Sequence, residues 1–311
     1  MSILVAASFD AADWRAWWPQ LEAALPAEQL LRAEEVRDAA AVEIALVANP
    51  PAGALKGLPS LRLVQSLWAG VDKLLNDPTV PTHVPLARMV DPAMNETMAE
   101  TALWAVLSLH RDFLTYAAQQ RAALWQPHRL RRADEIDVAV LGLGQMGAAA
   151  ARALVRQGYR VSGWSTRAAQ IDGVHTQAGD PALPAVLAAA DIVINLLPLT
   201  PATRGLFNAA TFAQMRRGAS LVNLARGAHV VDADLLKALA DGQLARAVLD
   251  VFHTEPLPQS HAFWAHPQII VLPHVAADTN PRSASRVVAA NVRALRDGQP
   301  LAHLVDRNRS Y

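Results

Sequence analysis

The sequence has no cysteine and no excess of charge of either sign. Without a thiol the chain can form no disulfide, no thiolate nucleophile and no metal site with cysteine ligands, and this composition agrees with a cytoplasmic location. Lysine and arginine number 28, as do aspartate and glutamate, so we expect no broad basic surface for nucleic acid or an anionic membrane. The expected partner is therefore a small molecule.

Long uncharged apolar runs are also missing, so no segment is expected to span a bilayer. The first residues carry no basic region or cleavage site, and they predict a strand rather than a signal peptide. The histidines lack a ligand pattern such as H-E-x-x-H, so no metal is expected. With 311 residues, of which 52% are hydrophobic and 18% charged, the chain is long enough for two domains with full cores.

A glycine turn, G-L-G-Q-M-G, dominates what is present. A strand is predicted before it over 136–141, and a helix over 148–157 and a second strand over 159–164 are predicted after it. In this context Gly142 can make the tight turn, Gly144 lets a pyrophosphate approach the backbone, and Gly147 lets the helix pack close to the strand. An ordinary glycine turn is the alternative, but the surrounding elements favour a dinucleotide site whose phosphates face the helix N-terminus.

The end of the second strand indicates which dinucleotide is bound. NAD sites place an acidic residue there to hold the ribose 2′-hydroxyl, whereas this chain has Ser165, Thr166 and Arg167. No acid repels a phosphate, and two hydroxyls with a guanidinium can bind a 2′-phosphate. The sequence therefore favours NADPH over NADH, with a solvated loop arginine as the alternative role of Arg167.

Both parts of the chain alternate strands and helices, which predicts an α/β fold. Strands are predicted in the first third over 2–7, 43–48 and 61–66. A helix over 95–123 would connect this third to the glycine turn, and the alternation then continues, with a helix capped by Asp232, to a strand over 269–272 and a last helix over 281–296. One face of an early helix is interpreted as core: Trp14, Trp17, Trp18, Leu21 and Leu25.

Two loops have two interpretations each. The segment 67–72 is a glycine turn that opens a short helix after a strand, and its backbone N–H groups could bind a carboxylate or the segment could simply be a packing turn. Trp68 and Met94 could narrow a pocket or belong to the core. The basic segment 124–132, which contains Trp125, is either a charged surface loop or a contact arm to a second subunit.

Three polar residues, Arg226, Glu255 and His274, stand at predicted ends of late strands, where ligands bind in open parallel sheets. Each alone could be an ordinary surface or loop residue. Together they fit hydride transfer to a carbonyl carbon, which needs a proton donor for the developing alkoxide and a cation for the substrate carboxylate. His274 would donate the proton, Glu255 would hold the other ring nitrogen and favour the imidazolium, and Arg226 would bind the carboxylate and carbonyl oxygen.

The order of these motifs resembles the D-isomer-specific 2-hydroxyacid dehydrogenases. The motifs are G-x-G-x-x-G at 142–147, N-L-A-R-G at 223–227, D-V-F-x-x-E-P-L-P at 250–258 and P-H at 273–274. Further segments are similar to the glyoxylate/hydroxypyruvate reductase A type of this family: L-L-P at 196–198, H-V-V at 229–231, P-H-V-A-A at 273–277 and V-D-R at 305–307. The resemblance covers essentially the whole chain.

The resemblance implies two Rossmann-like domains with parallel sheets. Residues 1–100 and 282–311 would form a discontinuous substrate domain, and residues 101–281 a dinucleotide-binding domain. It implies that Arg226, Glu255 and His274 are catalytic. It also implies a homodimer, as family members commonly form, with a tryptophan near the position of Trp125 approaching the partner's site.

The same resemblance completes the candidate site. The cofactor-binding candidates are Gly142, Gly144, Gln145, Met146, Gly147, Ser165, Thr166, Arg167, Leu197, Pro198, Ala225 and Asp250, the last reaching the nicotinamide amide. The substrate-binding candidates are Trp68, Ala69, Gly70, Arg226 and His274, with Ala69 and Gly70 contacting the carboxylate through their backbone. Two departures stand out: Ser165 replaces the acid of NAD-using relatives, and Ala276-Ala277 stands where many relatives carry glycine.

The sequence thus predicts an NADPH-preferring reductase of small 2-oxo acids that converts glyoxylate to glycolate and hydroxypyruvate to D-glycerate. The substrate preference follows from the resemblance alone. A dehydrogenase for a bulkier 2-oxo acid would share every motif. A non-catalytic, nucleotide-sensing partner protein of the same fold, like the family's transcriptional corepressors, is the other alternative.

Overall fold

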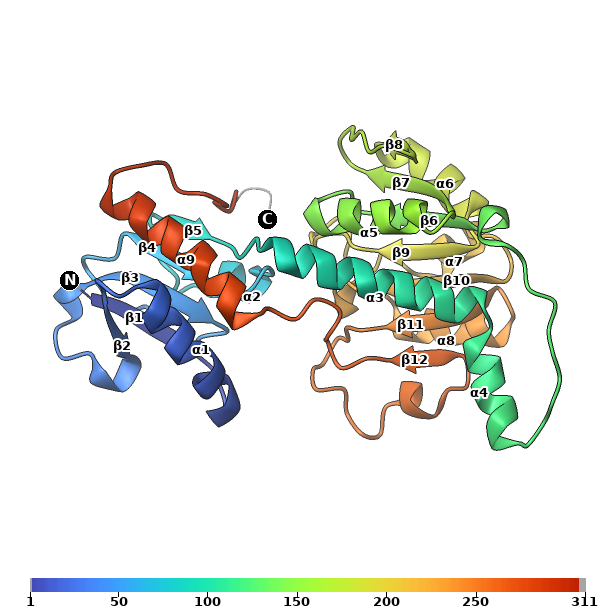
Figure 1. Ribbon diagram of the computed structural model, residues 1–311, viewed down its shortest axis with the longest axis horizontal. Coiled ribbons are helices and arrows are strands. Elements are labelled where there is room, and N and C mark those ends of the chain that lie inside the picture. The colour runs from blue at the N-terminus through green and yellow to red at the C-terminus, as the bar shows by residue number, and fades with distance from the viewer. Residues whose placement is uncertain (1, 308–311) are drawn as a thin grey trace. The chain divides into compact units, whose positions relative to one another are not determined.

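The computed structural model describes residues 2–307, and the chain divides into two compact units. The first unit comprises Met1–Met94 and Thr279–Tyr311, and the second comprises Asn95–Asp278. Each unit is built around its own sheet of parallel strands (Figure 1), which confirms the predicted α/β class. Within residues 2–307 no helix is both long and apolar enough to cross a membrane.

The first unit has a five-stranded sheet in the order β2-β1-β3-β4-β5, which is the order of flavodoxin-like doubly wound folds. Its last helix packs beside its first, and the buried Asn291 amide on that last helix donates a 2.7 Å hydrogen bond to Gln65 on β4. The elements are β1 (Ser2–Ala7), α1 (Ala11–Ala24), β2 (Gln29–Arg32), β3 (Val42–Ala48), β4 (Leu63–Ser66), α2 (Asp72–Asn76), β5 (Leu86–Ala87) and α9 (Pro281–Arg296).

The second unit has a seven-stranded sheet in the order β12-β11-β10-β9-β6-β7-β8, which is the Rossmann order with one added strand. The strands are β6 (Asp137–Leu141), β7 (Arg160–Ser165), β8 (Val174–Ala178), β9 (Ile192–Asn195), β10 (Ala219–Asn223), β11 (Leu244–Leu249) and β12 (Ile269–Val271). The helices are α3 (Pro92–His110), whose first three residues belong to the first unit, α4 (Phe113–Arg121), α5 (Gln145–Arg156), α6 (Leu183–Ala189), α7 (Ala209–Gln214) and α8 (Asp232–Ala240).

Side chains of this second sheet alternate between two cores, as the two-residue period of a strand requires. Val138 and Val140 of β6 pack with α3 and α5, whereas Ala139 and Leu141 pack with α6, α7 and α8. Both faces of the sheet are therefore covered by helices (Figure 1), and its central strands are largely apolar, whereas the edge strand β8 is not.

Four details differ from the sequence-based expectation. The predicted helix over 95–123 is two helices, because Asp112 adopts a left-handed conformation (φ 59°) and its carboxylate accepts hydrogen bonds from Thr115 and His128. The short edge strands β2 and β8 were not predicted. Val231 is the N-cap of α8, and Asp232 is its first helical residue.

The fourth difference concerns the early tryptophans. Trp17 is buried in the core as expected, with Leu21 and Leu25. Trp14 and Trp18 are only half-buried, and the Arg32 guanidinium lies over both rings, 4.4 and 5.0 Å from their centroids. These two rings therefore form a cation–π contact at the edge of the sheet rather than core.

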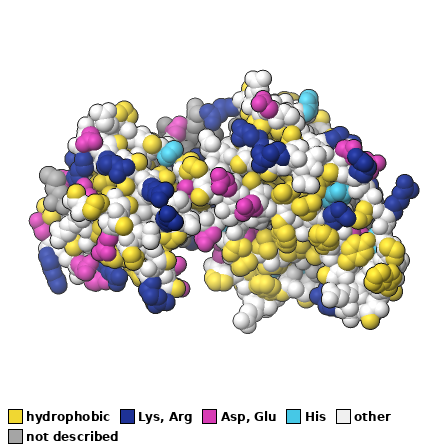
Figure 2. Space-filling view, in the orientation of Figure 1, with side chains coloured by type: hydrophobic (Ala, Val, Ile, Leu, Met, Phe, Trp, Pro, Cys, Tyr) yellow, Lys and Arg dark blue, Asp and Glu magenta, His cyan; other side chains and the backbone are white. Residues whose placement is uncertain are grey.

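Large apolar side chains remain on the surface of the second unit. Figure 2 shows hydrophobic atoms gathered over the face that carries α3 and α4. Trp104 and Phe113 are about half exposed, Leu124 likewise, and Trp125 is 97% exposed. A single exposed apolar residue needs no explanation, but a group of this kind is typical of an interface.

Candidate active site

The candidate residues of the second unit follow the ends of neighbouring strands. Along the carboxyl edge of the sheet, from β7 to β12, the loops carry in order Ser165–Arg167, the glycine turn, Leu196–Pro198, Arg226, Glu255 and His274. Adjacent strands lie about 4.8 Å apart, so this row extends over roughly 24 Å. The sheet order thus gathers residues that are up to about 130 positions apart in the sequence into one line.

The glycine turn joins β6 to α5 in the way that the motif predicts. Gly142 has a φ of +97°, and a Cβ there would lie 2.5 Å from the Leu196 carbonyl oxygen. A Cβ on Gly147 would lie 1.8 Å from the Gly142 carbonyl oxygen, so only glycine fits both positions. A Cβ on Gly144 would meet nothing within 4 Å, and no side chain in the described part of the chain (2–307) caps the start of α5. The backbone N–H groups here are open to an anion such as a pyrophosphate.

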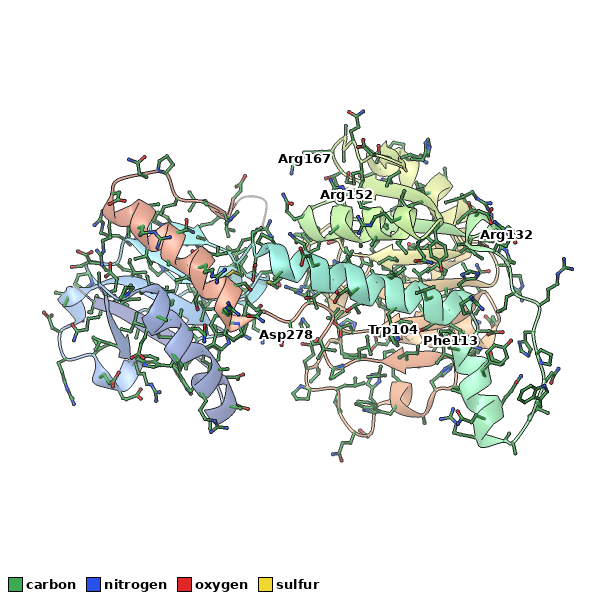
Figure 3. All side chains as sticks on the ribbon, in the orientation of Figure 1. Trp104, Phe113, Arg132, Arg152, Arg167 and Asp278 are labelled. Atoms are coloured by element: carbon green, nitrogen blue, oxygen red, sulfur yellow. The ribbon has the colours of Figure 1, made fainter. Side chains whose placement is uncertain are left out.

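The loop after β7 carries the residues expected to select the dinucleotide. Thr166 and Arg167 are exposed, and Figure 3 shows Arg167 on the outside of this loop. Among residues 2–307 no hydrogen bond or ion pair holds the Arg167 guanidinium. The Ser165 hydroxyl donates to the Arg167 carbonyl oxygen over 2.6 Å, so it shapes the loop as well as offering a lone pair.

Asp250, at the end of β11, anchors the turn that bears His274. Its buried carboxylate accepts hydrogen bonds from the backbone N–H groups of Val275 (2.7 Å) and Ala276 (3.0 Å), and its carbonyl oxygen accepts from His274 N–H. Burial raises the pKa of this carboxyl, against the opposing effect of the two N–H donors. The structure therefore uses both carboxylate oxygens to hold the turn.

Glu255 and His274 form a pair. The Glu255 carboxylate lies 2.8 Å from His274 Nδ1, and its other oxygen accepts from the Phe252 N–H over 2.9 Å. Burial alone would raise the pKa of Glu255, but the bonds from His274 and Phe252, with the charges of His274 and Arg226, outweigh it and leave the pKa below its ordinary value. A carboxylate that stays ionised fixes the orientation of the imidazole.

Arg226 follows β10 and is half-buried. Its guanidinium donates to the Ala225 carbonyl oxygen over 2.7 Å, and its positive charge contributes to the lowered pKa of Glu255. A Cβ on the next residue, Gly227, would lie 1.9 Å from the carbonyl carbon of Phe252, so the backbone after β10 presses against the loop after β11. The structure thus brings Arg226, Glu255 and His274 together at one end of the sheet.

A buried polar network lies near Arg226, and the sequence did not predict it. It consists of Asn195, Asn223 and His229, all fully inaccessible to solvent. Asn195 and Asn223 close two adjacent apolar strands, and this repeated asparagine was the only signal in the sequence. His229 had entered only as part of the H-V-V segment of the family resemblance and as one of the histidines without a metal-ligand pattern.

The remaining candidates lie in the first unit, in the loop after β4. The Ser66 hydroxyl accepts from Trp68 N–H (3.0 Å) and donates to the Trp68 carbonyl oxygen (2.9 Å). The Trp68 ring meets the rings of Phe9 and Trp17 edge to face, so the loop that bears Ala69 and Gly70 is firmly held. Met94 is buried, which favours the core interpretation of this side chain.

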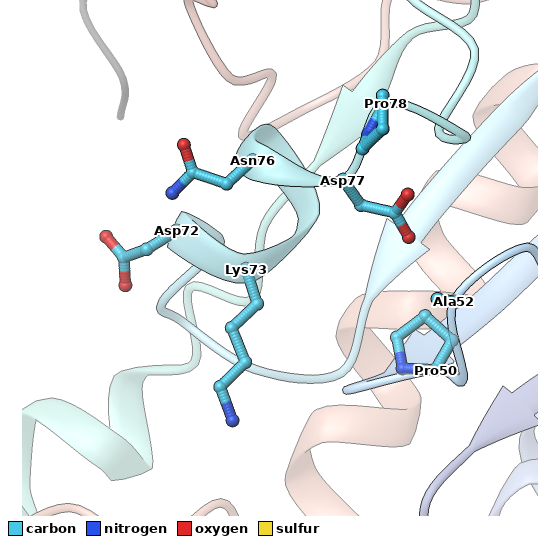
Figure 4. Close-up of a pocket in the computed structure, with 7 residues that line it drawn as sticks. All are labelled: Pro50, Ala52, Asp72, Lys73, Asn76, Asp77 and Pro78. Carbon is cyan, nitrogen blue, oxygen red and sulfur yellow. The ribbon is translucent and has the colours of Figure 1, made fainter. Parts of the chain in front are cut away.

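Two surface hollows lie apart from these residues. One, of about 480 Å³, is lined by residues of the first unit around α2, including Lys73 and Asp77 (Figure 4). The other, of about 580 Å³, lies in the second unit beside His110 and Tyr159. Neither contains a candidate catalytic residue, and the part of the chain from 2 to 307 has no group of acidic or histidine side chains placed to hold a metal.

The chain is similar to known proteins over its whole length. The D-isomer specific 2-hydroxyacid dehydrogenase NAD-binding domain matches residues 103–276. A glyoxylate/hydroxypyruvate reductase A of Serratia proteamaculans is 43% identical over 303 residues, 96% of each chain. A D-isomer specific 2-hydroxyacid dehydrogenase of Xanthobacter autotrophicus, solved with NADPH and MES, is 40% identical with a TM-score of 0.95, covering 100% of this chain and 99% of its own.

A second solved structure is that of an NADPH-dependent glyoxylate/hydroxypyruvate reductase of Sinorhizobium meliloti, in complex with NADP and sulfate. It is 34% identical, with a TM-score of 0.92 and full coverage of both chains. The doubly wound sheet, its glycine turn and the row of polar loops define a dinucleotide-dependent oxidoreductase. More narrowly, the chain belongs to the D-isomer specific 2-hydroxyacid dehydrogenase family, which confirms the resemblance found in the sequence.

The Glu255–His274 pair makes a prediction for His274→Ala. Because the substitution removes the hydrogen-bond donor and leaves the burial, the pKa of Glu255 should rise. A carboxyl with a lowered folded-state pKa stabilises the fold above its ordinary pKa of 4.5 and loses that contribution as the pH falls through the folded-state pKa. The variant should therefore be less stable than wild type at neutral pH, by a margin that disappears in acid.

The measurements are a carbon-13 titration of the glutamate carboxyls and urea unfolding at several pH values. His175→Ala is the control, since His175 is an exposed histidine of the same unit. An unchanged Glu255 titration in His274→Ala would show that the 2.8 Å contact does not hold the charge.

Proposed function

We propose that this protein is an NADPH-preferring reductase of small 2-oxo acids, reducing glyoxylate to glycolate and hydroxypyruvate to D-glycerate. The observation that carries the proposal is the 2.8 Å contact between His274 Nδ1 and Glu255, beside Arg226 and in the same unit as the glycine turn. The names of the Serratia and Sinorhizobium relatives support the substrate class, and the NADPH and NADP in two solved relatives support the cofactor.

In this proposal His274 is the proton donor. Glu255 occupies Nδ1, and the imidazole is half exposed, so Nε2 is the atom that gives its proton to the alkoxide oxygen. Glu255 holds the ring in place through the contact at Nδ1. Arg226 offers a planar guanidinium to the substrate carboxylate and carbonyl oxygen. Trp68, Ala69 and Gly70 are included as substrate-binding residues because of the family resemblance.

The cofactor-binding residues are proposed on the same basis. When bound, the reduced nicotinamide supplies the hydride. The open N–H groups at Gly144 and the start of α5 suit the pyrophosphate, and Thr166 and Arg167 suit a 2′-phosphate. Gln145 and Met146 lie in the first turn of α5, while Leu197, Pro198, Ala225 and Asp250 follow the central strands on the nicotinamide side of the row. Residues 101–281 are then the dinucleotide-binding domain, and residues 1–100 with 282–311 the substrate domain.

The experiment that tests the function is a panel of glyoxylate, hydroxypyruvate, pyruvate and a branched 2-oxo acid, each with NADPH and with NADH. Oxidation of the reduced nicotinamide is followed by its absorbance. We expect turnover of the two short acids, with a higher kcat/KM for NADPH. Preference for the branched acid would instead assign a bulkier substrate, and binding of NADPH without any turnover would favour the nucleotide-sensing alternative.

Arg167→Ala tests the cofactor preference. If the guanidinium binds the 2′-phosphate, the substitution should raise the KM for NADPH by about 10- to 100-fold, the cost of one charge-assisted hydrogen bond, and leave the KM for NADH nearly unchanged. The control is Arg156→Ala, which removes an exposed arginine from the other end of α5. Equal changes in both KM values would make Arg167 a merely structural residue.

We also propose a homodimer, with a cytoplasmic location where 2-oxo acids and reduced dinucleotides are metabolites. The exposed group of Trp104, Phe113, Leu124 and Trp125 on the second unit supports the dimer, because a second copy would cover apolar area that is otherwise in water. Figure 3 shows Trp104 and Phe113 near the junction of α3 and α4.

Trp125→Ser should weaken this dimer. Sedimentation across a concentration series should show a dissociation constant at least about fivefold higher than that of wild type, because an interfacial tryptophan commonly contributes more than 1 kcal/mol. Trp264→Ser, which alters another exposed tryptophan of the same unit, is the matched control. A wild-type chain that sediments as a monomer would contradict the proposal.

A further inference from the structure

The polar network of Asn195, Asn223 and His229 lies beneath the loops that follow β9 and β10, and we call it the Asn–His network. We propose that it positions Arg226 relative to the loop 196–198, with His229 acting as a neutral imidazole held in a single tautomer. The inference rests on the proposed reductase function and adds positioning residues to it.

The hydrogen-bond directions in the network follow from the two backbone groups that it contacts, the Leu197 N–H and the Arg226 carbonyl oxygen. The Leu197 N–H donates to Asn195 over 3.2 Å, so the atom it meets is Oδ1 and the opposite atom is the amide nitrogen. This nitrogen lies 2.9 Å from Asn223, which must present its oxygen. The Asn223 amide nitrogen is then free to donate to the Arg226 carbonyl oxygen, at 3.0 Å.

The same reasoning fixes the tautomer of His229. The second hydrogen of the Asn195 amide points to His229 Nδ1 at 3.0 Å, so Nδ1 must be the acceptor. The proton therefore resides on Nε2, which donates to the Pro198 carbonyl oxygen over 3.3 Å. A proton on Nδ1 would face the Asn195 N–H and abolish that bond. His229 is thus unsuited to proton transfer, in contrast to the half-exposed His274.

Each end of the network holds backbone next to the candidate site. The Asn223 side chain accepts from the Ala225 backbone N–H (3.3 Å) and donates to the Arg226 carbonyl oxygen. The backbone N–H of His229 also donates to that oxygen (3.2 Å). On the other side, Leu197 and Pro198 are held by Asn195 and His229. The network therefore connects the loop 196–198 with Arg226. The loop is proposed to contact the nicotinamide, and Arg226 is proposed to bind the substrate.

Burial makes this link stiff. All three side chains have a relative exposure of 0%, so no water can replace a lost partner without rearrangement. Gly227 is also pressed against Phe252, which leaves the backbone of Arg226 little freedom to shift. Loss of one network member should consequently displace Arg226, and displacements of about 1 Å at a reacting centre can cost roughly 100-fold in rate.

The first test reads the tautomer and does not depend on turnover. Nitrogen-15 histidine spectra of the full chain, assigned with His229→Phe, should show His229 with a protonated Nε2 and a bare Nδ1 at neutral pH. A proton on Nδ1, or on both nitrogens, would overturn the bonding scheme and with it the proposal.

The second test separates positioning from general stability. His229→Phe should lower kcat/KM for glyoxylate by about 10- to 100-fold. The matched control is His110→Phe, which removes another histidine of the second unit that is bonded through both nitrogens, to Tyr159 (2.9 Å) and the Arg131 carbonyl oxygen (2.7 Å), at the amino end of the sheet. The control should lose thermal stability without the loss in kcat/KM.

A double-mutant cycle completes the test. If His229 acts through Arg226, the double variant His229→Phe, Arg226→Lys should have a kcat/KM for glyoxylate less than about threefold below that of Arg226→Lys alone. The reason is that Arg226→Lys has already removed the guanidinium that the network would position. Two results would overturn the positioning role while the reductase function stood. One is a loss of kcat/KM in the double variant equal to the product of the two single losses. The other is an unchanged kcat/KM in His229→Phe. Absence of turnover in the wild-type chain would instead overturn the reductase function and the positioning role together.

Discussion

The candidate active site of the second unit depends on one buried carboxylate. Asp250 closes β11, and its two oxygens bind consecutive N–H groups of the turn that carries His274. That turn needs such an anchor, because His274 has a φ of 57°, in the left-handed region that costs a histidine energy. The same strand end leads through Phe252 to Glu255, so the anchor and the partner of the imidazole come from one short segment.

Asp250 and Glu255 are both carboxylates, but their surroundings give them different roles. Asp250 is buried and its pKa is raised, yet two N–H donors hold it in a structural role. Glu255 is more accessible: burial acts to raise its pKa, but the hydrogen bonds from His274 and Phe252, together with the neighbouring charges, outweigh burial and lower it. One acid therefore holds the backbone and the other holds an imidazole in place, and the distinction follows from burial and partners rather than residue type.

The sequence was sufficient for the features with a fixed local pattern. The glycine turn could be predicted because Gly142 and Gly147 occupy places where a Cβ would collide, and Arg226, Glu255 and His274 because strand ends meet at one edge of a parallel sheet. The break at Asp112 could not, since it depends on contacts with His128. The edge strand β8 lacks an apolar alternation, and the Asn–His network exists only through pairing of β9 with β10.

The Asn–His network lies at the point in the sheet order where two groups of strands meet. β6 and β7, which bear the glycine turn and the Ser165–Arg167 loop, lie on one side of β9, while β10, β11 and β12, which bear Arg226, Glu255 and His274, lie on the other. Binding of a dinucleotide and chemistry on a carbonyl are thus assigned to opposite halves of one edge. β9 is the strand where the halves meet, and its last residue, Asn195, contacts both the Leu197 backbone and His229. A rigid link of fully buried side chains at this junction can set the distance between the halves.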